Sequence, residues 1–311
     1  MTPTAFFVGA MLPRFAELPP RDGPVRILSD LHLGHDMSTV RSVASLRGLI
    51  AGAGRVIFNG DTLQERAGAF RERSQAMVEE LRQMCREEGA EVVFLRGNHD
   101  PTAWPLELVD LPEDRVTVTH GDVWLRLISP WSINMREFRP ALEAVHAEYG
   151  DAARRDLAVR FDILQRCRLA LPPSETRQQG HSLLARARLF CRELWPPRRP
   201  WEVLKVYGQL PGLASDFVRE FRPRSRVVVF GHTHRAKAWR RGGRLLVNTG
   251  AFVTFAAPAM VEIVDGVLTA WHLTEKDGCW QKHRVMAEEP LRDRMPVPCQ
   301  ENPRSPEPPA A

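Results

Sequence analysis

Five short runs of apolar, mostly β-branched residues each end directly in a small polar cluster, and this pattern most constrains how the 311-residue chain can fold. The runs are Val25–Leu28, Arg55–Phe58, Glu91–Leu95, Val116–Val118 and Val227–Phe230. Their composition is typical of strands that are buried on both faces of a sheet. Because ligands of open α/β sheets bind at the carboxyl ends of the strands, we expect the five clusters to converge on one site.

The clusters are rich in residues that bind metals. They are Asp30-Leu31-His32, Gly60-Asp61, Gly97-Asn98-His99-Asp100, His120-Gly121-Asp122 and Gly231-His232-Thr233-His234. Oxygen and imidazole ligands without a thiolate suit Mn²⁺, Fe²⁺ or Zn²⁺ better than Ca²⁺. One cluster alone fits a turn or a surface histidine, whereas the five together predict two adjacent divalent metals and a hydrolytic site.

In order and residue type, the clusters resemble the metal motifs of the calcineurin-like metallophosphoesterase superfamily. The resemblance runs from about residue 25 to about residue 272, with one large interruption. It implies an α/β fold, namely a two-sheet α/β/β/α metallophosphoesterase sandwich with a helical insertion. It also implies an enzyme that hydrolyses a phosphoester or pyrophosphate bond with water activated between two divalent metals, of which Mn²⁺ is the expected ion and Fe²⁺ and Zn²⁺ are alternatives.

The resemblance assigns a role to each residue of the motifs. The first metal would be held by Asp30, His32 and His234, the second by Asn98, His120 and His232, and both by the bridging Asp61. His99 would then protonate the leaving oxygen, and Asp100 would orient its ring.

Four residues outside these ligands are candidate substrate contacts, namely Arg96, His35, Arg235 and Asn248. An arginine beside a metal motif can bind phosphate oxygens through charge-assisted hydrogen bonds. The alternatives are a salt bridge for each arginine, a surface loop position for His35 and a turn position for Asn248.

A finer resemblance points to the UDP-2,3-diacylglucosamine hydrolase-like phosphoesterases of lipid A synthesis. It is carried by Ser29–Leu33, His120–Asp122, Gly231–Arg235 and Asn248–Gly250. That group usually has arginine at the position of His99, and its insertion is typically shorter. The expected substrate is therefore a phosphorylated small molecule or a lipid-linked one, with this nucleotide-sugar lipid as the specific candidate.

Two other functions remain open. The sequence Asp30–Gly34 also occurs in the DNA repair nucleases of the superfamily, and a pI of about 9.2 is compatible with a DNA- or RNA-acting phosphodiesterase. Against this alternative, the basic residues are interleaved with acids and no aromatic stacking platform is evident. The second of these functions is that of a non-catalytic binding scaffold, and the complete set of ligand residues argues against it.

The interruption spans residues 131–222 and is predicted to be helical. Its apolar residues recur at helical spacing, for example at Phe138, Leu142, Val145 and Tyr149. The segment carries 16 Lys and Arg against 11 Asp and Glu, a surplus equal to the net charge of +5 for the whole chain. It is either a solvated accessory helical bundle or a basic lid that selects the substrate.

The remaining pattern completes the predicted organisation. We expect an N-terminal arm over residues 1–24, a phosphoesterase core over 25–130 and 223–285, and a disordered tail over 286–311. Within the core, Ser38–Ala51 and Gln64–Glu88 are predicted helices. The predicted late strands are Arg244–Val247, Ala259–Val264 and Val267–Leu273, with a hairpin turn at Asp265-Gly266.

Composition predicts a soluble globular protein, which we expect in the cytoplasm. Hydrophobic residues make up 43% of it, enough for a substantial core. The longest apolar stretch, near the N-terminus, is too short to span a bilayer, although peripheral membrane contact stays open. The five cysteines form no CxxC pair and are odd in number, which is typical of reduced thiols in a cytoplasm.

Overall fold

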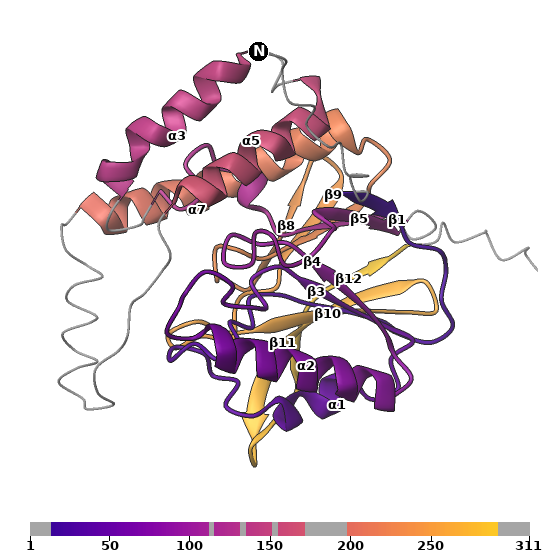
Figure 1. Cartoon of the computed structure of the whole chain (residues 1–311). Coiled ribbons are helices and arrows are strands. Elements are labelled where there is room, and N and C mark those ends of the chain that lie inside the picture. The colour runs from indigo at the N-terminus through magenta and orange to yellow at the C-terminus, as the bar shows by residue number, and fades with distance from the viewer. Residues whose placement is uncertain (1–13, 112–114, 131–134, 151–154, 172–197, 292–311) are drawn as a thin grey trace, which may run out of the picture.

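A computed structural model describes residues 14–111, 115–130, 135–150, 155–171 and 198–291 of the chain. Two six-stranded sheets pack face to face in this part of the molecule, with helices on both outer sides (Figure 1). The predicted α/β/β/α sandwich is therefore confirmed.

The first sheet has the order β1-β5-β6-β7-β9-β8. These strands are β1 (Phe15–Glu17), β5 (Leu108–Leu111), β6 (Val116–Thr119), β7 (Val227–Phe230), β9 (Arg244–Asn248) and β8 (Lys237–Arg241). Since β6, β7 and β9 are parallel, the residues that follow β6 and β7 lie at the same end of the sheet, where these strands have their carboxyl ends.

The second sheet has the order β12-β11-β10-β2-β3-β4. These strands are β12 (Cys279–Pro290), β11 (Val267–Lys276), β10 (Ala259–Val264), β2 (Val25–Leu28), β3 (Arg55–Asn59) and β4 (Glu91–Leu95). The parallel strands β2, β3 and β4 likewise deliver the first three polar clusters at one edge.

The strands are buried on both faces, as their composition predicts. Ile57 and Val229 lie in the core between the two sheets, with Val247 from β9. Their chain neighbours point outward, so that Phe58 packs under the helices of the second sheet and Phe230 under those of the first. Both faces of each motif strand are thus fixed by packing.

Both predicted core helices begin later than expected. The first consists of η1 (Val43–Leu46) and α1 (Arg47–Ile50). It does not begin at Ser38, because the Ser38 hydroxyl donates to the Leu31 carbonyl and Ser38 forms a β-bridge to Val253. The second, α2, spans Arg71–Glu87. Its predicted start at Gln64 is wrong because the Gln64 N–H donates to the Ser74 hydroxyl and its side chain faces the polar clusters.

The described part of the insertion is the outer helical layer of the first sheet. It contains α3 (Met135–Tyr149), α5 (Leu157–Ala170) and α7 (Arg198–Phe221). Phe161 of α5 and Phe217 of α7 are at most 1% exposed and pack with Phe230 of β7. These helices pack as the accessory layer that was one of the two alternatives, and the lid role stays a prediction. Residues 172–197 of the predicted helical insertion lie outside the described residues.

The sequence missed four strands, namely β1, β5, β8 and β12. β1 lies within the predicted arm and pairs with β5. β12 pairs with β11 as far as Pro290, so the predicted start of a disordered tail at residue 286 is wrong. Residues 292–311 lie outside the described part. Among the described helices, none combines the length and the apolar character needed to cross a membrane.

Candidate metal centre

The five polar clusters meet at the carboxyl edges of the two sheets and form two groups of ligand atoms. One group contains Asp30, His32, Asp61 and His234, and the other contains Asp61, His120 and His232. Within each group the ligand atoms lie within 4.8 Å of one another. The two groups share Asp61, which suits a dinuclear centre.

In the first group, three side chains face a common point. The Asp30 Oδ1 atom lies 3.3 Å from His234 Nε2 and 4.0 Å from His32 Nε2. The two Nε2 atoms are 3.3 Å apart. Two imidazole nitrogens directed at each other and at a buried carboxylate are the donor set of a divalent cation.

In the second group, backbone carbonyls orient both histidines. His120 donates through Nδ1 to the Asn59 carbonyl at 3.0 Å, which leaves Nε2 directed at Asp61 Oδ2, 3.4 Å away. His232 donates through Nε2 to the Ile128 carbonyl at 2.9 Å and keeps Nδ1 for a metal. Such hydrogen bonds fix the tautomer and the direction of a ligand.

Asn98 joins the second group through its side-chain oxygen, which lies 3.4 Å from His120 Nε2. All seven predicted ligands are therefore brought together at this edge. Which ligand holds which ion stays a prediction.

Asp61 lies between the two groups. Its Oδ1 atom accepts the backbone N–H of His99 at 2.8 Å, and its Oδ2 atom is 3.9 Å from His32 Nε2 and 3.4 Å from His120 Nε2. One oxygen thus anchors the carboxylate while the other faces both groups, which is the arrangement of a bridging ligand.

The backbone at the centre is strained. Five of the ligand residues have a positive φ, namely Asp30 at 54°, His32 at 46°, Asp61 at 51°, His232 at 66° and His234 at 56°. Each such residue costs about 1 kcal/mol or more, and strain of this kind collects at functional sites.

Glycine is required where two motifs approach each other. A Cβ atom on Gly97 would lie 2.2 Å from Asp61 Oδ1, and one on Gly231 would lie 2.1 Å from Asp30 Oδ2. Both distances are far shorter than van der Waals contact. The glycines of the motifs therefore make room for the carboxylates of neighbouring motifs.

The protonation of the site follows from burial and from Asp61. Burial, together with His99, lowers the pKa of His32 well below its usual value, and burial with His120 lowers the pKa of His232 to about 4. Burial acts the same way on His120, but the Asp61 carboxylate outweighs it and raises the pKa of His120 to about 10. A bound dication would therefore have to displace the His120 proton, as neutral imidazole is the ligand form.

Comparison with known families decides what kind of centre this is. Residues 23–236, more than half of the chain, match the calcineurin-like phosphoesterase family. The chain belongs to this family.

Similar solved structures include Vps29 complexed with zinc from Entamoeba histolytica, which is 14% identical with a TM-score of 0.38 over 86% of this chain and 99% of that chain. A predicted phosphoesterase from Streptococcus pneumoniae is 16% identical with a TM-score of 0.34 over 84% and 97%. A cold-active protein-tyrosine phosphatase from Shewanella is 13% identical with a TM-score of 0.40 over 89% and 83%. No curated protein sequence matches the chain.

Within this phosphoesterase site, Gln64 orients His99. The Gln64 side chain is 1% exposed, and its amide lies between two imidazoles, 2.7 Å from His32 Nδ1 and 3.0 Å from His99 Nδ1. The two histidine rings are edge to face with centroids 4.8 Å apart. Sequence reasoning missed Gln64, although its position three residues after Asp61 in a strand-end loop was the available signal.

The predicted role of Asp100 is wrong. Its carboxylate accepts the backbone N–H groups of Gly97, Asp61, Thr62 and Leu63 and the indole N–H of Trp104, at 2.7 to 3.2 Å. Asp100 therefore fixes the two loops that carry Asp61 and Asn98. It does not orient the His99 ring, because its oxygens face the backbone.

The predicted substrate contact of Asn248 is also wrong. The side chain is 0% exposed; Nδ2 donates to the Gly231 carbonyl and the Thr233 hydroxyl, and Oδ1 accepts the Gly250 N–H. Asn248 is a structural residue that holds the loop of His232.

The other three candidate substrate contacts, Arg96, His35 and Arg235, lie in three different environments. Arg96 donates to the Trp104 carbonyl and lies 3.4 Å from Glu107, so the salt-bridge alternative describes it. His35 is 8% exposed, packs against the Phe70 ring at an interplanar angle of 53° and accepts the Met37 N–H at Nδ1. Arg235 is exposed beside His234, with its guanidinium 5.0 Å from the Tyr207 ring. Substrate contact by His35 and Arg235 stays a prediction.

A buried ion network behind the centre was not predicted. Arg168 of α5 makes two hydrogen bonds to Asp122, at 2.7 and 2.9 Å, and one to Glu107 at 2.8 Å. All three side chains are at most 1% exposed. No local sequence signal joins these residues, since Arg168 comes from the insertion, and the network ties that insertion to the His120-Gly121-Asp122 motif.

Proposed function

We propose that the chain is a metal-dependent phosphoesterase that hydrolyses a phosphoester or pyrophosphate bond. The observation that carries the proposal is the pair of ligand groups that share Asp61. Metal-binding groups joined in this way at the strand ends suit a phosphoryl group whose negative charge has to be stabilised during hydrolysis.

The donor set of the centre fits two divalent ions, and Mn²⁺ is our first candidate. When bound, such ions activate water and neutralise phosphate oxygens. Asp30, His32 and His234 would hold one ion and Asn98, His120 and His232 the other. Asp61 has one oxygen free of the backbone to face both ions.

His99 is proposed to give a proton to the leaving oxygen. The Gln64 Oε1 atom accepts the Nδ1–H of His99 at 3.0 Å, so Nε2 is the atom left to meet a substrate, and it carries a proton to give in the imidazolium form. Burial lowers the pKa of His99, and the Asp61 carboxylate opposes this shift. The His99 backbone N–H donates to Asp61, which fixes the residue beside the bridging carboxylate. The ring also packs against His32, so the donor atom is placed next to the metal ligands.

A nucleotide-sugar lipid resembling UDP-2,3-diacylglucosamine is the proposed specific substrate. The support is the exposed Arg235 beside His234, in a position to bind a phosphate, with Tyr207 beneath its guanidinium. The Tyr207 hydroxyl donates to the Thr233 carbonyl at 2.9 Å, which joins α7 to the last metal motif. We further propose a cytoplasmic location, in line with free thiols at Cys85, Cys167 and Cys279.

The proposal is tested by assaying the purified protein with Mn²⁺ on three substrates, namely an aryl phosphodiester, UDP-2,3-diacylglucosamine and single-stranded DNA. We expect hydrolysis that EDTA removes and Mn²⁺ restores, with the nucleotide-sugar lipid cleaved fastest. Preferred cleavage of DNA would favour the nuclease alternative. No metal-dependent hydrolysis of any substrate would favour the binding scaffold.

The His99→Ala variant tests the proton donor. It should keep its metals and lose about 10²–10⁴-fold in rate, the usual contribution of a general acid. The loss should be smaller on an aryl ester with a good leaving group. His283→Ala, which changes an exposed histidine on β12, is the matched control and should leave the rate unchanged. Equal losses on good and poor leaving groups would remove His99 from this role.

A further inference from the structure

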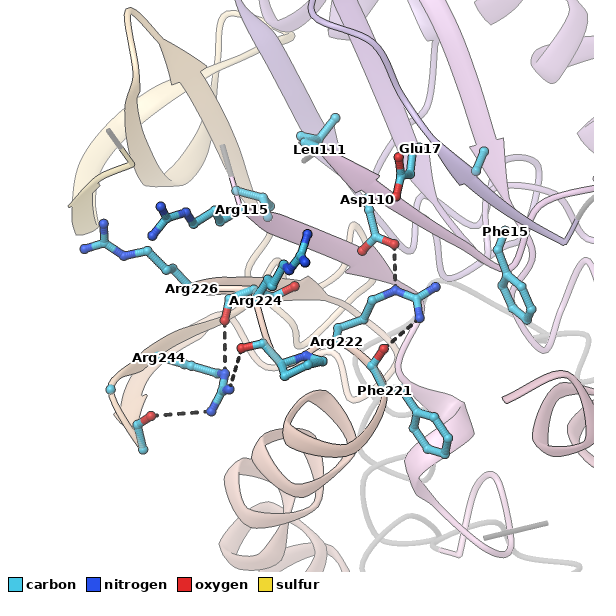
Figure 2. Close-up of a pocket in the computed structure, with 16 residues that line it drawn as sticks. Phe15, Glu17, Asp110, Leu111, Arg115, Phe221, Arg222, Arg224, Arg226 and Arg244 are labelled. Atoms are coloured by element: carbon cyan, nitrogen blue, oxygen red, sulfur yellow. Dashed lines mark hydrogen bonds and ion pairs between the residues drawn. The ribbon is translucent and has the colours of Figure 1, made fainter. Parts of the chain in front are cut away.

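An arginine-rich cavity of about 1050 Å³ lies at the amino ends of strands of the first sheet. Figure 2 shows the residues that line it. Its arginines are Arg115, Arg222, Arg224, Arg226 and Arg244. Arg115, Arg226 and Arg244 stand at the amino ends of β6, β7 and β9, and the metal motifs follow the carboxyl ends of β6 and β7. The arginine cavity and the metal centre are therefore separated by the length of a strand, roughly 15 Å.

The lining of the arginine cavity carries an excess of positive charge. Five arginines face two carboxylates, Glu17 and Asp110. Asp110 is already paired with Arg222 at 2.6 Å and accepts the Thr117 hydroxyl. Arg226 lies 3.5 Å from Glu289, which also binds Arg240 at 2.7 Å, so the five arginines of the lining still outnumber Glu17, Asp110 and Glu289.

Arg244 shows how these charges are held in place. Its guanidinium donates to the carbonyls of Ser225 and Pro223, both at 3.0 Å, and of Gly242 at 3.5 Å (Figure 2). Carbonyl oxygens fix the position of a cation without removing its charge. Arg244 is thus preorganised to meet an anion.

The backbone beneath the other arginines is also fixed. The Arg115 carbonyl accepts the N–H groups of both Arg226 and Val227, at 2.8 and 3.2 Å. Arg115 itself has a φ of 52°, a conformation that costs a non-glycine residue about 1 kcal/mol or more. The hydrogen bonds hold the strand starts of β6 and β7 together, so their arginines project from one rigid rim.

The other end of the arginine cavity is aromatic. Phe15 and Phe221 lie on the side of Arg222 away from Arg226 and Arg244 (Figure 2). Each ring is held by another ring, Phe15 by Phe161 at 5.3 Å and Phe221 by Phe217 at 5.1 Å. A flat ring system can pack against such phenyl groups at little entropic cost.

We propose that the arginine cavity binds a nucleotide. The phosphates lie against Arg115, Arg224, Arg226 and Arg244, and the base lies toward Phe15 and Phe221. A polyphosphate relieves the repulsion among clustered guanidinium groups, and guanidinium is the side chain best suited to bind phosphate. The cavity is large enough for such a ligand. None of these residues is a metal ligand, so this site is independent of the proposed hydrolytic function.

Calorimetric titration of the metal-loaded, full-length protein with ADP tests the proposal. The double variant Arg115→Gln/Arg224→Gln should bind ADP about 10-fold more weakly or worse, because two phosphate contacts are lost. The matched control Arg73→Gln/Arg284→Gln removes the same charge from exposed positions on α2 and β12 and should bind as the unaltered protein does. Equal weakening in both variants, or no binding at millimolar ADP, would overturn the proposal.

Two further arms locate the ligand. The Asp61→Ala variant should still bind ADP, because the metal centre is elsewhere; loss of binding in this variant alone would place ADP at the metals and overturn the proposal. Pyrophosphate and adenosine should each bind more weakly than ADP, and pyrophosphate binding as tight as that of ADP would overturn the nucleotide assignment. The single Arg224→Gln variant, which alters an exposed side chain, repeats the test if the double variant does not fold.

Discussion

The two ends of the first sheet hold opposite kinds of site. At the carboxyl end, most ligands of the metal centre are short side chains that are almost fully buried, such as Asp30 at 0% and His232 at 4% exposure, and Asn98 and His234 are half-buried. At the amino end, the arginine cavity is built from long side chains, of which Arg115 and Arg224 are exposed. The same strands therefore carry one site that depends on backbone geometry and one that depends on side-chain reach.

The difference explains why only one of these sites has a sequence motif. A carboxylate or imidazole can reach a metal only if its own backbone is correctly placed, so ligands such as Asp30 and His32 stand two residues apart with positive φ angles. A guanidinium can reach the same cavity from several segments. The arginines consequently come from separate parts of the chain, and no local sequence pattern predicts the cavity.

Asp61→Ala gives the largest expected effect at the metal centre. Because the Asp61 carboxylate faces both ligand groups, we expect activity to be abolished and metal content to fall at both positions. Elemental analysis and the phosphodiester assay measure the two effects. Asp277→Ala, in an exposed turn with a similar φ of 51°, is the matched control and should change neither. Two metals per chain in the Asp61 variant would contradict its shared position.

Arg168→Met tests how much a buried arginine contributes to stability in comparison with an exposed arginine of the cavity. The buried Asp122 carboxylate loses its arginine and Glu107 keeps only Arg96, so the free energy of unfolding should fall by about 3–5 kcal/mol. Arg224→Met, which alters an exposed arginine of the cavity, should change it by about 0.5 kcal/mol or less. Urea denaturation measures both. Similar changes in the free energy of unfolding of the two variants would mean that the buried network does not stabilise the fold more than an exposed arginine does.

Gln64→Leu has the smallest expected effect on the metal centre. The amide that positions His32 and His99 is lost while the ligands remain, so metal affinity and rate should each fall about 10–100-fold. Gln83→Leu changes an exposed glutamine on α2 and should alter neither quantity. A metal titration followed by a rate measurement checks both variants. Unchanged metal affinity in the Gln64 variant would show that the contact with His32 does not position this ligand.

The sequence predicted the features that depend on neighbouring residues. The five motif strands and the sandwich follow from contiguous apolar runs, and the ligand residues follow from the clusters after them. Asp100 belongs to one of these clusters and Asn248 ends strand β9, but the predicted roles of both residues are wrong. In both cases the side chain turns inward to bond backbone groups of distant loops, and a sequence does not show where a side chain turns.

What the sequence could not predict depends on contacts between distant segments. Arg168 meets Asp122 only because α5 packs on the first sheet, and the insertion is a structural layer for the same reason. The strands β1 and β5 are short and pair with each other across about 90 residues, from Phe15 to Leu108. Such elements are stabilised by tertiary packing and carry little local signal.

The central claim is that two metal groups share Asp61, and anomalous X-ray diffraction from crystals grown with Mn²⁺ tests it most directly. We predict two anomalous peaks about 3.5–4 Å apart, one on each side of the Asp61 carboxylate. One peak should lie among Asp30, His32 and His234, and the other between His120 and His232. A single peak, or no density beside His120 and His232, would contradict the account.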